Sequence, residues 1–244
     1  SYPIAKSLFP AFSKLNIKES YHPLEKMFKL SIKYASLLIM PASLVIALLS
    51  REAVWLLYGP QYQYAPNYLA LYILSFLCVG LGMFVLDNLF NSQGDTNATF
   101  KINLANFLPA VTLAPILTLY YGVLGLIGSI LTSQLISIIY GLSLAHKKYS
   151  LNPDWKPILK IGVASLTCLL IVYTTLNTTP INNYLYRLIL GGALYTTLYL
   201  AIAPITGAIN RTDIQNLHES TKEIAIYPII KPILKLETKI LNLL

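Results

Sequence analysis

Six long apolar stretches take up most of this chain, and each is long enough to cross a membrane as a helix. They run approximately over Leu30–Leu49, Tyr68–Phe90, Ile102–Tyr121, Val123–Ala145, Ile158–Leu176 and Tyr184–Ala208. About 20 helical residues cross a hydrocarbon layer roughly 30 Å thick. A lipid-facing backbone must satisfy its own hydrogen bonds, which leaves helices or closed barrels, and these runs lack the alternation of barrel strands. The sequence therefore predicts an all-α integral membrane protein, a bundle of six transmembrane helices.

The composition excludes a soluble protein of several domains. Hydrophobic residues make up 55% of the chain and charged residues 11%, against roughly 25% charged residues in soluble domains. The net charge of +8 does not indicate a nucleic-acid partner, because no basic stripe is interleaved with aromatic residues for base stacking. Membrane lipids are the partners that this composition predicts.

The basic residues alternate between the two sides of the predicted bundle. Sixteen of the 18 Lys and Arg residues, with Lys33 counted, fall before the first span, in the second and fourth connections and in the tail, whereas Arg51 and Arg187 alone fall in the others. Connections rich in Lys and Arg face the cytoplasm. We therefore predict a multi-pass protein of the cell membrane with a cytoplasmic C-terminus.

Both ends of the chain differ from the six apolar stretches. Residues 224–244 are apolar with Lys231, Lys235 and Lys239 at every fourth position, which indicates an amphipathic helix, either on the cytoplasmic leaflet or packed against the bundle. The chain begins at Ser1, and Tyr2–Leu15 is typical of the end of another helix. We expect a C-terminal piece of a longer protein.

A polar cluster is predicted where the second and third spans meet. Asp87 and Asn91 are four residues apart, and Asn103 and Asn106 share a face of the next span. A short connection brings the two polar ends together, so these four residues are candidates for a site at the cytoplasmic mouth of a cavity. The alternative is that Asp87 reaches the membrane surface and pairs with Lys101 or Lys33.

Lys33 and Tyr34 enter the first span from the predicted cytoplasmic side. A lysine there is an interfacial anchor or, alternatively, a contact for a lipid diphosphate. Pro41 in the first span, and Pro109 and Pro115 in the third, predict helix bends, since an interior proline removes a helical hydrogen bond.

Small residues form a series in the fourth span with a spacing of four: Gly125, Ser129, Ser133, Ser137 and Gly141. Such a series marks a helix face that another helix approaches closely.

No enzyme chemistry is indicated. His22, His146 and His218 lie in separate segments without ligand spacing, and no nucleophile–base set or phosphate-binding glycine loop occurs. We predict neither a metal site nor a cofactor.

Several short stretches, in their order, resemble one transporter family. They are Leu8–Ser13, Ser31–Tyr34 leading to Met40–Pro41, Leu56–Gly59 with Gln61, Tyr62 and Ala65, Asn88–Asn91 with Gly94, and Tyr121–Gly125. The chain resembles the C-terminal half of a polysaccharide-biosynthesis flippase, of the superfamily that includes multidrug exporters and the lipid II flippase. The resemblance covers residues 1–145, and the last two spans are similar by hydropathy.

The resemblance implies one lobe of a two-lobed transporter that moves a lipid-linked (polyprenyl diphosphate) oligosaccharide by alternating access, with an N-terminal lobe missing here. It implies the end of a preceding helix with a basic loop in 1–29, four helices of the C-terminal lobe in 30–145, two further helices in 146–208 and a cytoplasmic tail in 209–244. Lys33 and Lys101 are the residues similar to the family's cavity cations.

Three other functions stay open. A cation-coupled drug exporter of the same superfamily would need an acidic residue deep in the bundle, and Asp87 lies near one end of its span. A membrane-embedded glycosyltransferase would need carboxylates or metal ligands in its loops, which hold only scattered acids. A membrane scaffold would use the basic tail for docking.

Overall fold

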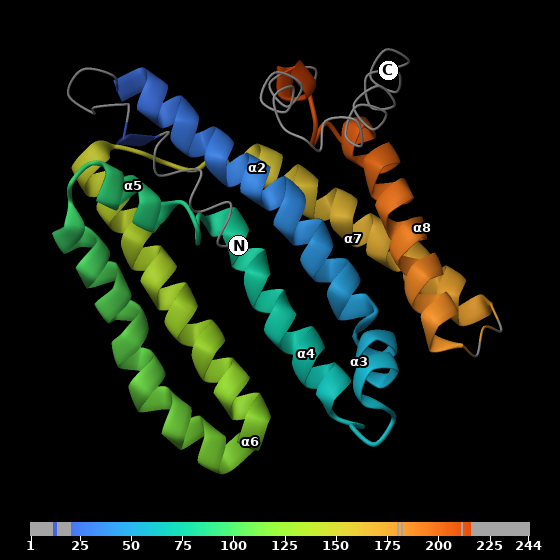
Figure 1. Ribbon diagram of the computed structural model, residues 1–244. Coiled ribbons are helices and arrows are strands. Elements are labelled where there is room, and N and C mark those ends of the chain that lie inside the picture. Colours follow the sequence, from blue (N-terminus) through green and yellow to red (C-terminus); the bar gives the residue numbers. More distant parts are fainter. Residues whose placement is uncertain (1–11, 14–20, 180, 182, 211, 216–244) are drawn as a thin grey trace. The chain divides into compact units, whose positions relative to one another are not determined.

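The fold is helical throughout the part of the chain that the structure describes, which is residues 12–13, 21–179, 181, 183–210 and 212–215 of a computed structural model (Figure 1). The elements in order are α2 (Tyr21–Leu48), α3 (Ser50–Tyr58), α4 (Ala65–Leu74), the 3-10 helix η1 (Ser75–Leu81), α5 (Leu86–Ser92), α6 (Thr96–Tyr149), α7 (Trp155–Thr178) and α8 (Tyr184–Ile205). The predicted all-α membrane fold is confirmed. The predicted amphipathic helix over 224–244 lies outside the described residues.

Four of the described helices are long and apolar enough to cross a membrane: α2, α6, α7 and α8. The segments Ala65–Leu81 and Leu86–Ser92 pass the same test together as a bent pair and would make a fifth crossing. The count of six therefore depends on whether α6 crosses once or twice.

Helix α6 turns back on itself at Gly122 (Figure 1). It holds 54 residues, and a straight helix of that length would be about 80 Å long. Gly122 has φ 59° and ψ −136°, a conformation open to glycine and strained for other residues. Two antiparallel arms result, 96–121 and 123–149. The predicted turn at residues 120–122 is thus confirmed, and the count of six spans stays a prediction.

The second predicted span is not one helix, and this expectation was wrong. It consists of α4, η1 and α5, and the pair Ala65–Leu81 and Leu86–Ser92 is bent by 45°. Gly82 ends η1 with φ 91°, which is left-handed backbone that favours glycine. Gly80 and Gly82 weaken the helix at this point, because glycine costs about 1 kcal/mol relative to alanine inside a helix.

The three prolines lie inside helices that continue past them, Pro41 in α2 and Pro109 and Pro115 in α6. The interruption of α6 is at Gly122 and not at either of its prolines. The predicted bends at the three prolines stay predictions.

The chain divides into two compact units, and α2 begins in one and ends in the other. Unit 1 comprises Ser1–Met40 and Asn67–Asp154, and unit 2 comprises Pro41–Pro66 and Trp155–Leu244. The segment boundaries predicted at residues 29, 145 and 208 stay predictions.

Unit 1 is held together along the second arm of α6. All members of the series Gly125, Ser129, Ser133, Ser137 and Gly141 are buried, as their spacing predicted. A side chain added at Gly141 would lie 3.0 Å from Leu86 Cδ1 and 3.3 Å from Ile102 Cδ1. The small residues therefore let α5 and the first arm approach the second arm closely.

Unit 2 packs α7, α8 and α3 together (Figure 1). The hydroxyl of the buried Tyr195 on α8 donates to the Ser165 carbonyl of α7 at 3.1 Å. Asn183 caps α8, because its Oδ1 accepts from Leu185 N at 2.9 Å. A Cβ added at Gly191 would lie 2.8 Å from Leu49 Cδ2, so α8 approaches its neighbour closely at this glycine.

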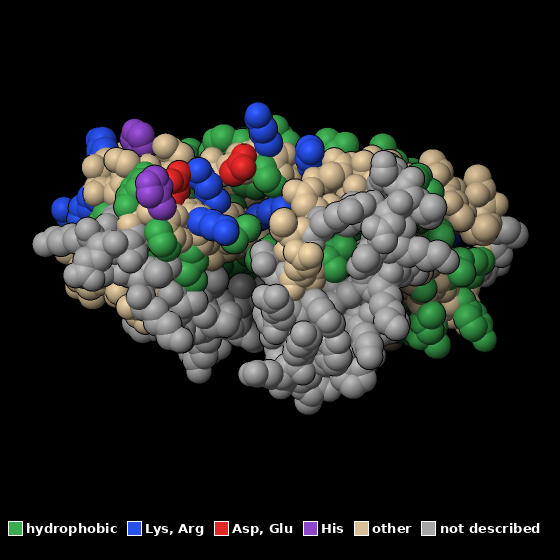
Figure 2. Space-filling model, turned by 90° about the horizontal axis from the view of Figure 1, so that it is seen from above, with side chains coloured by type: hydrophobic (Ala, Val, Ile, Leu, Met, Phe, Trp, Pro, Cys, Tyr) green, Lys and Arg blue, Asp and Glu red, His purple; other side chains and the backbone are tan. Residues whose placement is uncertain are grey.

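Within each unit, the connections fall at two opposite ends, as the charge pattern predicted. In unit 1 the start of α2 meets the end of α6, where the Tyr21 hydroxyl donates to the Ser150 carbonyl, and Lys148 pairs there with Asp95. Figure 2 looks onto this end and shows basic side chains and histidines over it.

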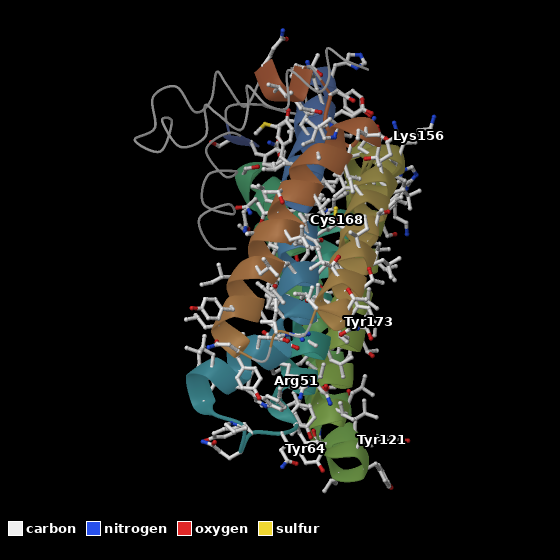
Figure 3. The ribbon with its side chains drawn as sticks, turned by 90° about the vertical axis from the view of Figure 1, so that its right-hand side faces the viewer. Arg51, Tyr64, Tyr121, Lys156, Cys168 and Tyr173 are labelled. Carbon is white, nitrogen blue, oxygen red and sulfur yellow. The ribbon has the colours of Figure 1, made fainter. Side chains whose placement is uncertain are left out.

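Unit 2 has the same polarity along its own helices. Figure 3 shows Lys156 at one end, Arg51 and Tyr64 at the other, and Cys168 and Tyr173 between them. Lys160 lies near Gly207, beyond the end of α8, and Arg187 pairs with Glu52 at the far end. The alternating groups of connections are therefore sorted to opposite ends within each unit.

Candidate functional site

A cavity of about 410 Å³, lined by both polar and apolar side chains, lies inside unit 1, between the broken second span and the α6 hairpin. Its volume is in the range of small-molecule sites. The lining combines carboxylate, amide and hydroxyl side chains with apolar ones: Tyr72, Met83, Phe84, Leu86, Asp87, Ile102, Asn103, Asn106, Ala110, Ile130, Ser133, Gln134, Ser137 and Ile138.

Asp87 reaches the cavity because the second span is broken just before it. After Gly82 the chain turns, and α5 begins at Leu86, so Asp87 lies in the first turn of a new helix. An acidic residue is favoured in the first turn, where the unpaired N–H groups of the helix lie. The glycine break therefore gives this carboxylate a favourable position beside the cavity.

Asp87 has a buried side-chain oxygen that no described residue satisfies with a hydrogen bond. Its Oδ1 is shielded from solvent and has no hydrogen-bond partner among the described residues. A buried carboxylate without a partner is costly, and such groups in membrane proteins usually face a partner or a cavity. The structure therefore places beside the cavity a carboxylate that has one oxygen without a described hydrogen-bond partner.

The first arm of α6 contributes the two amides that the sequence analysis placed with Asp87. Asn103 and Asn106 both line the cavity. Both lie in the first arm of α6, which follows α5. The short connection between the two spans therefore brings Asp87, Asn103 and Asn106 together, and their functional role stays a prediction.

The second arm of α6 contributes polar residues that the sequence analysis did not assign to a site. Gln134 donates from Nε2 to Met83 Sδ at 2.6 Å, and Ser137 donates from Oγ to the Ile102 carbonyl at 3.2 Å. Ser133 and Ser137 were interpreted as packing residues, and they also line the cavity. Gln134 is a polar amide in the middle of an apolar span, and this signal could have identified the second arm of α6 as part of the cavity lining.

Four residues predicted for the site are not part of the cavity lining. Asn91 is half-buried on α5, and Lys101 is exposed on α6. Lys33 is buried in α2, where it is 8% exposed, and Tyr34 is half-buried beside it. The cavity lining therefore holds Asp87, Asn103 and Asn106 without these four, and the roles predicted for all seven residues stay predictions.

A second polar cluster closes the end of unit 1 where α6 begins and ends. Asp95 caps the N-terminus of α6, because its Oδ1 accepts from Ala98 N at 3.2 Å. The Lys148 ammonium, from the last turn of the same helix, donates to Asp95 Oδ2, and the Tyr149 hydroxyl lies 3.5 Å from that oxygen. This carboxylate therefore joins the two arms of the hairpin.

The charge of Lys148 acts on the acidity of Asp95. The hydrogen bond from Lys148 to the carboxylate holds the pKa of Asp95 below its ordinary value. A carboxyl whose pKa is lowered by folding stabilises the fold above its unfolded pKa of about 4, and that contribution is lost as the pH falls through the lower folded pKa.

Asp95→Asn is expected to lower the melting temperature of the protein at pH 7. Asparagine caps helices as well as aspartate does, so the loss reports the ion pair, which contributes less than about 1 kcal/mol at this exposure. The difference from the parent protein should shrink as the pH falls below about 4. Lys148→Gln should match Asp95→Asn in thermal unfolding scans, while equal destabilisation by Lys147→Gln would contradict a specific pair.

In the described part of the chain, no group of three or more His, Cys, Asp or Glu residues could hold a metal ion. The cavity combines one carboxylate with amides and hydroxyls, which can bind and orient a polar guest.

Comparisons with known proteins relate this fold to one family. A family model described as "Lipid II flippase MurJ" matches residues 2–195. A solved structure of a lipid II flippase MurJ in an inward closed conformation is similar with a TM-score of 0.71 and 16% sequence identity. The match covers 83% of this chain and 42% of that one. No curated protein matches the chain. At this identity the solved structure shows a shared fold, and the chain spans less than half of its length.

Proposed function

Because the chain belongs to the lipid II flippase family, we propose that it forms part of a transporter that moves a lipid-linked precursor across the cell membrane. The family consists of transporters, so the prediction that the chain is not an enzyme is confirmed. The observation that carries the proposal is the family match over residues 2–195, together with a fold similar to that of a solved flippase.

The family match supports the superfamily predicted from the sequence but names a different family within it. A flippase of the superfamily with multidrug and polysaccharide exporters was predicted, and the wider relationship is confirmed. The narrower assignment to polysaccharide flippases has no support from the matched family, whose printed description names lipid II. We therefore propose lipid II as the first substrate to test, and a lipid-linked oligosaccharide as the second.

We further propose that the chain works with a second lobe. It corresponds to 42% of the solved flippase, which fits one lobe of a two-lobed transporter that alternates between its two sides. Each arm of α6 would be about 40 Å long, enough to cross the hydrocarbon layer once. Counting both arms separately, with the bent second span, gives the six crossings of one lobe.

The orientation follows from the charges. The ends that carry Lys147 and Lys148 in unit 1, and Lys156 and Lys160 in unit 2, would face the cytoplasm. Within unit 2, the two basic residues at the opposite end are both engaged. Arg187 pairs with Glu52 at 2.9 Å, and the Arg51 guanidinium lies over the Trp55 ring. A cytoplasmic C-terminus is part of this proposal.

We propose that the cavity controls the conformational changes of the transport cycle. Asp87 has an unpartnered carboxylate oxygen, so the state of its charge changes the free energy of this part of unit 1. An entering proton, water or small cation would satisfy that oxygen and favour one shape of the broken span over another. The cavity, at about 410 Å³, is one polar site within a lobe and does not enclose a whole lipid-linked saccharide.

Complementation in cells tests the proposed substrate class. The full-length protein that contains this chain is expected to restore growth of cells depleted of their own lipid II flippase. Restoration of polysaccharide export alone, in cells that lack a polysaccharide flippase, would assign the second substrate. Restoration of neither, by protein that reaches the membrane, would contradict transport of a lipid-linked precursor and favour a scaffold.

A further inference from the structure

Helix α3 is a short helix at the end of unit 2 that the sequence analysis did not predict. It follows α2 after one residue, holds nine residues and ends at Gly59, where φ is 91°. Helix α3 crosses the end of α8 and does not run alongside α8 (Figures 1 and 3). Its length, at about 14 Å, is too short for a membrane crossing.

One face of α3 is fixed to unit 2. Glu52 is buried, with its side chain 7% exposed, and accepts from Arg187 Nε of α8 at 2.9 Å. Val54 is also buried, and the Trp55 ring packs edge-on against the Tyr184 ring of α8, with centroids 5.4 Å apart. The position of α3 relative to α8 is therefore set by an ion pair and an aromatic contact.

The C-terminal end of α3 and the turn that follows it are exposed and unusually apolar. Leu57 is 73% exposed, and the other large exposed side chains are Leu56, Tyr58, Tyr62 and Tyr64. Tyr58 and Tyr62 pack edge to face, and Gln61 donates to the Tyr58 carbonyl at 2.6 Å, so the turn is ordered around these rings. Tyrosine and tryptophan gather where a membrane meets water, because their rings have an apolar body and a polar edge.

Arg51 places an exposed positive charge at the start of α3, over the Trp55 ring. Its guanidinium lies 4.2 Å from the centroid of the Trp55 ring. Among the described residues, Arg51 has no carboxylate partner, since the nearby Glu52 pairs with Arg187. A guanidinium stacked on a ring keeps the N–H groups at its edge, and these match the oxygen atoms of a phosphate.

We propose that α3 and the turn to Tyr64 form an interfacial anchor that binds phospholipid headgroups at the non-cytoplasmic surface. Leu56 and Leu57 would enter the outer part of the acyl layer, the tyrosines would lie at headgroup depth, and Arg51 would contact a lipid phosphate. The charge and the aromatic composition favour a lipid layer over a protein partner. This surface is separate from the cavity of unit 1, and its test does not depend on transport.

Tryptophan fluorescence tests this anchor in the intact protein. Emission from Trp55 is obtained as the difference between the parent protein and Trp55→Phe, both reconstituted in phosphatidylcholine vesicles. Lipids brominated at successive acyl positions quench rings at the matching depth. We expect quenching to be strongest with bromines nearest the headgroup and to fall steadily with depth. Absence of quenching, or strongest quenching at the bilayer centre, would overturn the proposal.

The phosphate contact of Arg51 has its own readout. Brominated phosphatidylglycerol, diluted into unbrominated phosphatidylcholine, should quench Trp55 more than its bulk fraction predicts, because the negative lipid gathers at the guanidinium. Arg51→Gln should reduce this excess to the bulk value. Lys147→Gln, which removes an equal charge from α6 in unit 1, should leave it unchanged. An excess that survives in Arg51→Gln would overturn the assignment of Arg51.

Discussion

Gly125→Ala is expected to destabilise unit 1 by about 1–3 kcal/mol or more, the largest effect on stability of any single substitution considered. The added Cβ would overlap the backbone carbonyl of Leu117 on the other arm of α6. A backbone cannot rotate away as a side chain can, so the two arms must separate at the turn. Thermal unfolding of the purified protein measures the loss.

Gly128→Ala is the matched control for that substitution. It lies one turn further along the same arm, and a Cβ there has nothing within 4 Å. Alanine is a better helix former than glycine by about 1 kcal/mol, so this variant should be as stable as the parent or slightly more so. Similar losses for both variants would contradict the close approach of the arms at Gly125.

Asp87→Asn is expected to slow transport by roughly ten- to a hundredfold while the protein stays folded. Interactions of a charged group contribute about 1.5–3 kcal/mol each, and every 1.4 kcal/mol is about a factor of ten in rate. Asparagine keeps the shape of the side chain and removes its charge, so a change reports the charge in the cavity. Rates are measured in vesicles, with thermal unfolding as the test of folding.

Asn91→Ala separates the structural assignment from the one based on sequence. Asn91 was placed with Asp87 by its spacing, and the cavity lining contains Asn103 and Asn106 without it. We expect Asn103→Ala to slow transport and Asn91→Ala to leave the transport rate near that of the parent.

For Asp87→Asn, a transport rate equal to that of the parent would count against any role for the cavity in the cycle.

Much of the fold could be predicted because apolar length is a strong signal. The stretches found in the sequence correspond to α2, the bent second span, both arms of α6, α7 and α8, and the turn at Gly122 was expected between two spans. The burial of the small-residue series was also predicted, since a spacing of four marks one face of a helix.

The parts that could not be predicted depend on contacts between distant segments. Helix α3 begins with the charged pair Arg51 and Glu52, which is typical of a loop in the sequence, and it is helical in a place where Glu52 meets Arg187. The break in the second span has a local signal in Gly80 and Gly82, but glycine is common in transmembrane helices, so its effect depends on the packing around it.

Only the part of the candidate site that comes from neighbouring segments of the chain could be predicted. Asp87, Asn103 and Asn106 lie near each other along the chain, across one short connection, so spacing was enough to group them. Gln134 reaches the cavity from the far arm of the α6 hairpin, and its contact with Met83 joins residues 51 positions apart. Helical spacing indicates which residues share a face and leaves open what that face meets.

Transport in vesicles tests the central claim most directly. The chain is reconstituted together with the second lobe proposed for it. Labelled lipid II is placed in one leaflet, and its appearance in the other is followed with a reagent that cannot cross the membrane. We predict faster appearance than in vesicles without protein, a slower rate with Asp87→Asn, and competition by unlabelled lipid II. Folded protein that leaves the rate at that of empty vesicles, for lipid II and for a lipid-linked oligosaccharide, would contradict a flippase.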